Sequence, residues 1–415
     1  MVYNIHPINL IRALSLALEL STGGLSRHHW RTAMIANRIA EQIQLEPLQR
    51  QILVYAALLH DLGAASNWTE KRKIQGLEYS RELCRHAEAG YQLLKGSVQF
   101  GILAEPIRYH HECWDGSGAA ELAGKKIPLL SRMINIADRV EILLRDGQPI
   151  FEQRPIILAA IRNYSGTYFD PELVRALHDF SQQESFWLDL TNPQYFQNFF
   201  RNMDAYGRIR LTIDDVVNIA EIFATIIDNT SRFTASHSRT VSIAAEYLAR
   251  QKGYSTEEVK TMRIAGLLHD LGKLSIPKAI LEKPDKLTER EFAIIKQHTY
   301  YTYRILEQID GFEVIAEWAA FHHETLDGTG YPFRVKEESL KLGSRIVAVA
   351  DVFTALTENR PYRTLLEASQ VEKIMRSMVS NRRLDGKIVA DLFSNGLEPY
   401  SLVQMANKHF SLASA

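Results

Sequence analysis

The stretch Val259–Lys273, VKTMRIAGLLHDLGK, decides the fold class, because its apolar residues recur at spacings of three and four up to His269. That periodicity indicates an amphipathic helix with one buried face. Five further segments show it: Ile8–Leu20, Trp30–Ile43, Gln51–His60, Val216–Asp228 and Val241–Gln251. Strand-like alternation of apolar and polar residues is scarce. We therefore predict an all-α protein of packed helix bundles.

The length and charge of the chain limit the classes of function. Its 415 residues exceed what one core needs and predict two or three domains. Lys plus Arg total 48 against 49 for Asp plus Glu, which excludes a global positive field that would hold polymeric nucleic acid or an anionic membrane. The cysteines number only two, Cys84 and Cys113, so we expect reduced thiols and a cytoplasmic location.

The N-terminal apolar segment Ile8–Leu20 resembles a secretory leader only superficially. Arg12 and Glu19 interrupt it, and no basic segment precedes it. We expect an amphipathic helix there. No other window has the run of about 18 apolar residues that a membrane span requires.

The second half of the chain repeats the first. His29 precedes His237 by 208 residues, and His60-Asp61 precede His269-Asp270 by 209. The offset is 212 for three further pairs: His86 with His298, His110-His111 with His322-His323, and Asp115-Gly116 with Asp327-Gly328. Asp138 precedes Asp351 by 213. Such a slowly drifting offset predicts two copies of one helical domain separated by small loop insertions. We predict domains over 1–150 and 207–415, with 151–206 as a helical connector or the end of the first domain.

Seven residues of the second copy are candidate metal ligands. His269-Asp270 precede Gly272, at which we expect the helix to end. A lone His-Asp pair in such a place is more often a buried histidine beside a capping aspartate. Here, however, the whole set lies beside apolar helical segments: His237, His269, Asp270, His298, His322, His323 and Asp351. Burying so many polar groups without partners would be costly, and a metal pair offsets that cost.

The ligand types indicate the chemistry. Imidazoles and carboxylates without cysteine suit iron, manganese, zinc or nickel. Seven ligands exceed one tetrahedral shell but suffice for two ions that share a carboxylate, with positions left for water and substrate. That arrangement is typical of phosphoester hydrolysis. Iron that activates dioxygen remains an open alternative.

The residues after the ligands predict a substrate rim. The loop His322–Pro332, HHETLDGTGYP, supplies two glycines for a sharp turn and a tyrosine ring on which a base could stack. Lys273, Arg360 and Arg363 are cations suited to phosphate.

Together these motifs resemble the HD-GYP family of HD phosphohydrolases. HDLGK at His269–Lys273, the following IPKAILEKPDKLT, the HHExxDGTGYP string ending at Pro332 and ADVFTALTENRPYR ending at Arg363 match its pattern in order and spacing. The resemblance implies an all-α, cytoplasmic domain of bacterial second-messenger signalling. It implies hydrolysis of cyclic di-GMP or 3′,3′-cyclic GMP-AMP to a linear dinucleotide.

The resemblance also implies residue roles. One ion would be held by His237, His269, Asp270 and Asp351, and Asp270 would bridge to a second ion held by His298, His322 and His323. A third ion in some members needs a glutamate where this chain has Phe233, so we expect two divalent ions, iron or manganese, with zinc or nickel as alternatives. Asp270 and Lys273 would be catalytic. Substrate contacts would come from Lys273, Asp327, Gly328, Gly330, Tyr331, Pro332, Arg360 and Arg363.

The first copy keeps the candidate ligands but loses the substrate motifs. Its candidate second metal site comprises His29, His60, Asp61, His86, His110, His111 and Asp138. Ala64 replaces the lysine, Gly116–Ala120 replaces the GYP ending, and no Arg-Pro-Tyr-Arg follows Asp138. We predict a degenerate HD domain with a regulatory or structural role. A non-hydrolytic nucleotide sensor, an HD phosphohydrolase of another nucleotide, and a homo-oligomer stay open.

Overall fold

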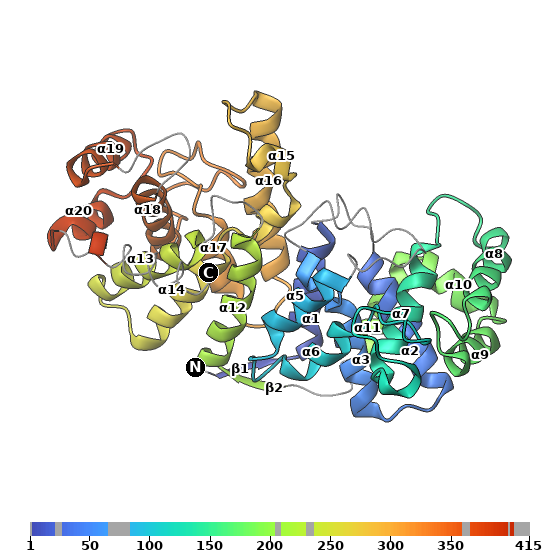
Figure 1. The fold of residues 1–415 in the computed structure, drawn as a ribbon. Coiled ribbons are helices and arrows are strands. Elements are labelled where there is room, and N and C mark those ends of the chain that lie inside the picture. The colour runs from blue at the N-terminus through green and yellow to red at the C-terminus, as the bar shows by residue number, and fades with distance from the viewer. Residues whose placement is uncertain are drawn as a thin grey trace. The chain divides into compact units, whose positions relative to one another are not determined.

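A computed structural model of the chain describes residues 2–20, 27–64, 84–203, 209–229, 236–358, 366–396 and 399–401. It divides into two compact units (Figure 1). The N-terminal unit spans 6–209, and the C-terminal unit comprises 210–415 together with the first five residues. Each unit is a bundle of helices.

The N-terminal unit runs from blue to green in Figure 1. Its elements are α1 (Pro7–Leu20), α2 (His28–Gln42), α3 (Pro47–Leu59), η1 (Leu62–Ala64), α5 (Cys84–Leu94), α6 (Gly101–Arg108), η3 (Gly124–Lys126), α7 (Leu129–Ile142), α8 (Ile150–Asn163), α9 (Pro171–Phe180), α10 (Glu184–Thr191) and α11 (Pro193–Met203), where η denotes a 3₁₀-helix.

The C-terminal unit runs from yellow-green to red. Its elements are α12 (Ile213–Asp228), α13 (His237–Gln251), α14 (Thr256–Leu268), η5 (Leu271–Ser275), α15 (Lys278–Leu281), α16 (Glu289–Leu306), α17 (Glu313–Ala320), α18 (Leu342–Thr357), α19 (Ala368–Ser380) and α20 (Gly386–Ser394). A two-stranded sheet pairs β1 (Val2–Ile5) with β2 (Ile209–Thr212).

The all-α prediction is confirmed, since β1 and β2 are the only strands among the described residues. Four helices of the C-terminal unit begin with capping boxes, at Thr212, Ser255, Thr288 and Glu367. In each, the capping side chain accepts a hydrogen bond from the backbone three residues later, whose own side chain accepts from the cap. None of the described helices combines the length and the apolarity needed to cross a bilayer.

The helix packing of one unit recurs in the other. In the N-terminal unit α3 packs against α1, α2 and α6, and α2 also packs against α7. In the C-terminal unit α14 packs against α12, α13 and α17, and α13 also packs against α18. The helices α3 and α14 therefore lie at the centre of equivalent bundles, and their C-terminal ends carry the two His-Asp pairs.

The segment 151–206, predicted as a helical connector or the end of the first domain, contributes the helices α8 to α11, which the structure groups with the N-terminal unit. Helix α9 packs against α2 and α7. Arg31 on α2 donates from Nε to the carbonyl of Leu190 on α10, at 3.0 Å. These helices thus pack on the side of the bundle that α2 and α7 form.

Gly272 does not end a helix as expected. Helix α14 ends at Leu268, and Gly272 lies in η5. The reason for glycine is steric, because a Cβ there would lie 1.9 Å from the carbonyl oxygen of His298 on α16. Gly63 has the same relation to His86, with 2.1 Å to its carbonyl oxygen. Each glycine lets a histidine-bearing helix approach the His-Asp turn.

Adding a methyl group at these glycines tests that close approach. We expect Gly272→Ala and Gly63→Ala each to lower the free energy of unfolding by about 2–3 kcal/mol, because the backbone of the neighbouring helix must move away. Gly96→Ala is the control, since no atom lies within 4 Å of its added Cβ. Thermal unfolding measures the difference, and equal melting temperatures for all three variants would refute the steric role.

Candidate metal centre

The C-terminal unit brings all seven predicted ligands into one buried cluster. They come from helix ends and helix interiors: His237 opens α13, His269 and Asp270 follow α14, His298 lies in α16, His322 and His323 follow α17, and Asp351 lies in α18. Bundle packing therefore gathers residues from five helical segments. Two groups of donor atoms are close enough for a shared ion: His237, His269 and Asp351, and His298, His322 and His323.

Backbone carbonyls orient three of the imidazoles. His269, His298 and His322 each donate from Nδ1 to the carbonyl three residues earlier, at 2.8, 2.5 and 2.6 Å. A neutral imidazole that donates from Nδ1 keeps its lone pair on Nε2. In all three, the lone pair of Nε2 is therefore available to a cation, as in carbonyl-anchored histidines of metal sites.

Asp270 lies between the two groups. Its Oδ2 is 3.1 Å from Nε2 of His269 and 3.9 Å from Nε2 of His237. Its other oxygen, Oδ1, is 3.5 Å from Nε2 of His298. One carboxylate thus faces both groups, as the bridge between two cations must.

The protonation states suit cation binding. Burial lowers the pKa of His298 to about 3 and that of His322 well below its usual value. Burial would raise the pKa of Asp270, but the charges of His269 and Lys273 hold it well below its ordinary range. Near neutral pH His298 and His322 are consequently neutral and Asp270 is ionised.

His237 depends on a residue that the sequence analysis missed. Its Nδ1 lies 3.0 Å from Oε2 of Glu358, and its Nε2 lies 3.2 Å from Oδ1 of Asp351. Burial opposes its positive charge, but these two carboxylates raise its pKa to about 10. A cation at Nε2 would therefore replace a proton. The position of Glu358 two residues before the Arg-Pro-Tyr-Arg motif was the only sequence signal for it.

A second missed residue, Glu324, shapes the rim loop. Its carboxylate accepts hydrogen bonds from the backbone N–H groups of Phe333 at 2.7 Å and Val335 at 3.0 Å. The loop also needs Gly330, because a Cβ there would lie 2.5 Å from the Cα of Glu324. Glu324 thereby holds the GYP residues beside the histidine that precedes it.

Tyr331 and Lys273 reach the centre. The Tyr331 ring lies 4.9 Å from the His323 ring, and Nζ of Lys296 lies 5.6 Å from its centroid. Lys273 pairs through Nζ with Oδ2 of Asp270, at 2.5 Å. An aromatic face and an ammonium group thus flank the candidate metal ligands.

The remaining predicted substrate contacts differ in position. Asp327 accepts hydrogen bonds from its own loop, from Oγ1 of Thr325 at 2.5 Å and from N of Thr329 at 3.0 Å, so its carboxylate closes the turn. Gly328 has a positive φ of 72°, which that turn requires. Pro332 follows Tyr331 in the loop. Arg360, Arg363 and Phe233 lie outside the described residues.

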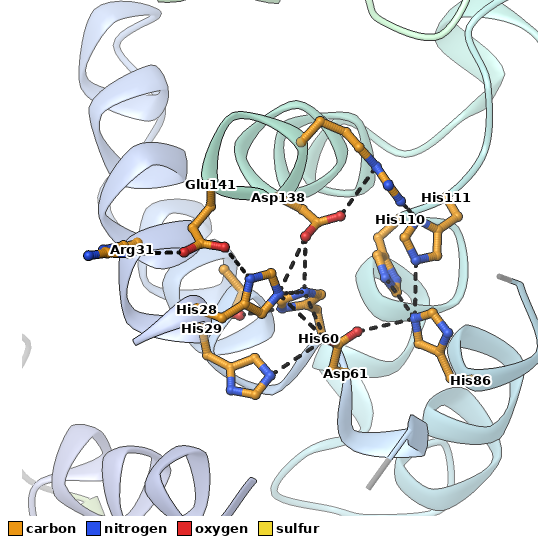
Figure 2. A network of polar contacts seen from close by, with 12 residues as sticks. His28, His29, Arg31, His60, Asp61, His86, His110, His111, Asp138 and Glu141 are labelled. Atoms are coloured by element: carbon orange, nitrogen blue, oxygen red, sulfur yellow. Dashed lines mark hydrogen bonds and ion pairs between the residues drawn. The ribbon is translucent and has the colours of Figure 1, made fainter. Parts of the chain in front are cut away.

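The N-terminal unit contains a matching cluster (Figure 2). Around Asp61, the candidates His29 and His60 lie on one side, and His86, His110 and His111 on the other. Oδ1 of Asp61 is 3.2 Å from Nε2 of His86, and Oδ2 is 3.7 Å from Nε2 of His29. Asp138 Oδ1 lies 3.8 Å from Nε2 of His60. All seven predicted residues of this copy are therefore brought together.

His28 is a further member of the N-terminal cluster, and it corrects the register of the repeat. As the first residue of α2 it corresponds to His237, the first residue of α13, at an offset of 209 residues. Its Nε2 lies 3.4 Å from Oδ1 of Asp138, and its Nδ1 lies 2.5 Å from Oε2 of Glu141. His29, which we had paired with His237, corresponds instead to Ser238. Adjacent histidines made the pairing ambiguous until the helix start was known.

Both clusters fit divalent cations. Nε2 of His269 and Oδ1 of Asp270 are buried and make no hydrogen bond within the described residues. The same holds for both carboxylate oxygens of Asp138. Buried acceptors of this kind need a positive partner, and imidazole with carboxylate suits first-row transition metals.

A carboxylate also lies behind each cluster. In the C-terminal unit Oδ1 of Asp228 accepts from N and Oγ of Ser238, at 3.1 and 2.7 Å. In the N-terminal unit Oε1 of Glu19 accepts from N of His29, at 2.6 Å. Both acids therefore meet the first turn of the helix that opens with a candidate ligand.

Comparison with known proteins gives consistent matches. The sequence model of the HD domain family matches residues 12–173 and 221–388. The 3′3′-cGAMP-specific phosphodiesterase 1 of Vibrio cholerae is 31% identical over 95% of this chain and 94% of its own length. A cyclic di-GMP phosphodiesterase of Pseudomonas aeruginosa is 36% identical over 39% of each chain. The crystal structure of V-cGAP3, a cyclic GMP-AMP specific phosphodiesterase of V. cholerae, superposes with a TM-score of 0.67 and 26% identity, covering 94% of this chain and 97% of that one.

The buried carboxyl of Asp228 predicts a pH dependence of stability. Burial raises its pKa from 3.8 to about 6, so the folded state holds this proton more tightly than the unfolded state. Its contribution to stability therefore falls as pH rises from about 4 to 6, and the loss is complete above pH 6, at about 3 kcal/mol. We expect Asp228→Asn to remove this loss while keeping the acceptor for Ser238.

Thermal unfolding of metal-free protein between pH 4.5 and 7.5 tests this expectation. The advantage of Asp228→Asn over the wild type should grow with pH. Asp285→Asn, which changes an exposed carboxylate, is the control. A constant difference across the pH range would contradict the raised pKa.

Proposed function

The chain belongs to the HD domain family, in its HD-GYP branch, and on that basis we propose that its C-terminal unit is a metal-dependent phosphodiesterase that opens a cyclic dinucleotide. The observation that carries this proposal is the position of Asp270. Its two oxygens face separate groups of histidine Nε2 atoms at 3.1 and 3.5 Å. One bridging carboxylate with ligands on both sides is the donor arrangement of a dinuclear hydrolytic site.

The residues of the C-terminal cluster divide between two cation positions. His237, His269 and Asp351 serve one, His298, His322 and His323 serve the other, and Asp270 serves both. Two divalent ions, iron or manganese, would supply an activated water and neutralise the phosphoryl charge during in-line attack. Carbonyl-anchored imidazoles keep their lone pairs aimed at those positions before any ion binds, so little reorganisation is needed.

Residues beside the ligands would bind the substrate. Lys273 pairs with Asp270 in the structure and is partly exposed. Once Asp270 faces cations, the ammonium group is available to a phosphate oxygen at the same edge of the centre. The ring of Tyr331 offers a stacking face for a base, and Glu324 fixes the loop that carries it. Arg360 and Arg363 are proposed to supply further phosphate contacts.

The relatives guide the choice of substrate. Two 3′3′-cGAMP-specific phosphodiesterases of V. cholerae match 95% and 90% of this chain, and therefore both of its units. The cyclic di-GMP phosphodiesterase of P. aeruginosa matches only 39% of it. We accordingly place 3′,3′-cyclic GMP-AMP first and cyclic di-GMP second.

The N-terminal unit is proposed to be regulatory or structural. Ala64 stands where Lys273 stands in the active copy, so no ammonium group meets the substrate side of Asp61 from that position. We also propose a cytoplasmic location, in keeping with Cys84 and Cys113, which form no disulfide.

Paired double variants test which unit performs the chemistry. His269→Ala with Asp270→Ala removes the bridge and one imidazole, so we expect linear product to fall by roughly 10³-fold or more. The matched pair His60→Ala with Asp61→Ala should keep most of the activity. Chromatography of manganese- or iron-loaded protein with each cyclic dinucleotide measures the product. Absence of turnover with either substrate, in protein shown to contain metal, would rule out the proposed activity.

Lys273→Ala tests the proposed phosphate contact. Loss of this cation should lower kcat/KM by roughly 10²-fold, since a charge-assisted contact to the transition state is removed. Metal content should stay unchanged because Lys273 is no ligand. Lys387→Ala, an exposed residue of α20, is the control. Unchanged kcat/KM in Lys273→Ala would show that the ammonium group serves only to pair with Asp270.

A further inference from the structure

The two centres differ at positions directly beside their ligands. Arg139 follows Asp138 in the N-terminal unit, whereas Val352 follows Asp351 in the C-terminal unit. Similarly, the first histidine of α2 is followed by a second histidine, whereas His237 is followed by a serine. Arg139 adds a buried cation, and His29 adds a candidate metal-ligand atom.

Arg139 contacts two candidate ligands of its own unit. It is 5% exposed, and its Nη2 lies 3.1 Å from Nδ1 of His111. Its Nε lies 3.4 Å from Oδ2 of Asp138. A guanidinium group has donors and no acceptor, so Nδ1 of His111 must accept this hydrogen bond.

That hydrogen bond fixes the tautomer of His111. A neutral imidazole that accepts at Nδ1 carries its proton on Nε2, and Nε2 of His111 lies 3.1 Å from Nε2 of His86. His111 is therefore placed to donate to His86, and the lone pair that a cation needs is absent. His60 and His110 have the opposite arrangement, because each donates from Nδ1 to the carbonyl three residues earlier, at 2.8 and 2.6 Å.

The side of Asp61 that faces His28, His29 and His60 has more candidate metal-ligand atoms than the corresponding side of Asp270 in the C-terminal unit. His28 contacts Glu141 through Nδ1, so its Nε2 faces Asp138 Oδ1 at 3.4 Å and Asp61 Oδ2 at 3.5 Å. His29 adds an imidazole whose Nε2 is 3.7 Å from the same Asp61 oxygen. Three histidines, His28, His29 and His60, have ligand atoms close enough to share one ion.

We propose that the N-terminal centre holds one divalent cation, bound by His28, His29, His60, Asp61 and Asp138, and that Arg139 takes the place of a second. The guanidinium group supplies positive charge beside Asp138 and withdraws His111 from the ligand set. This inference rests on the metal chemistry of the proposed function but not on turnover. It makes the unit a single-ion site within a chain whose other centre takes two.

Metal counting on the full chain tests the proposal. The background variant combines His269→Ala, Asp270→Ala and His298→Ala, which removes candidate ligands from both proposed cation positions of the C-terminal centre. Metal-free protein is loaded with Mn²⁺, passed through gel filtration and analysed by elemental mass spectrometry and electron paramagnetic resonance. We expect one tightly held ion per chain with the spectrum of an isolated Mn²⁺. Two ions with a coupled spectrum, or no ion, would overturn the proposal.

Three further variants assign the roles of individual residues. Arg139→Val in the same background introduces the residue of the other copy and should raise the count from one ion to two. His29→Ser should weaken Mn²⁺ binding at least ~10-fold. The reciprocal change Val352→Arg, in otherwise unaltered protein, should remove one ion from the C-terminal centre.

The outcomes separate this inference from the proposed activity. A count of one in the background variant supports the inference even if the unaltered chain hydrolyses no cyclic dinucleotide. A count that stays at one in folded Arg139→Val, with circular dichroism as the check on folding, shows that Arg139 does not exclude the second ion. If that variant does not fold, the background count and the His29→Ser affinity still decide the case.

Discussion

The short hydrogen bond from Nδ1 of a buried histidine to the carbonyl three residues earlier is the interaction on which both centres depend. It forms at His269, His298 and His322 in one unit and at His60 and His110 in the other. It fixes both the ring orientation and the tautomer. The accepting carbonyl lies in the last turn of a helix in every case but that of His298, whose partner Ile295 lies inside α16. The Nε2 atoms converge because the helices that carry them converge.

Convergence in turn needs an unusually close approach of backbone segments. Helix α16 can bring His298 to Asp270 only because Gly272 leaves space at its carbonyl, and α5 has the same relation to Gly63. Thr302 on α16 reinforces the contact, since its hydroxyl donates to the carbonyl of His269 at 3.1 Å and accepts from N of Gly272 at 2.9 Å. The ligand geometry is thus built from backbone contacts, so side chains on the outer faces of the helices are free to differ between the two units.

Sequence reasoning predicted the fold class and selected candidate ligands that the structure brings together, because both follow from patterns local in the chain. Apolar periodicity marks the helices, and the repeat aligns the histidines. It failed where the answer depends on contacts between elements. The residue at which α2 begins decides that His28, and not His29, corresponds to His237. The roles of Glu358 and Arg139 depend on contacts with residues far away in the sequence, His237 and His111. Gly272 looked like a helix terminator, yet it serves a neighbouring helix.

The burial of the N-terminal cluster limits which of its residues can be exchanged singly. A residue outside the cluster can be exchanged singly with little strain on the fold, as at Ala64, which stands where the C-terminal unit has Lys273. The interlocked imidazoles and carboxylates cannot, because deleting one leaves the others charged or unsatisfied in a dry interior. Substitutions are therefore tolerated around the buried cluster before they are tolerated within it. If the N-terminal centre holds a cation as proposed, the folding of this unit is coupled to the supply of that metal.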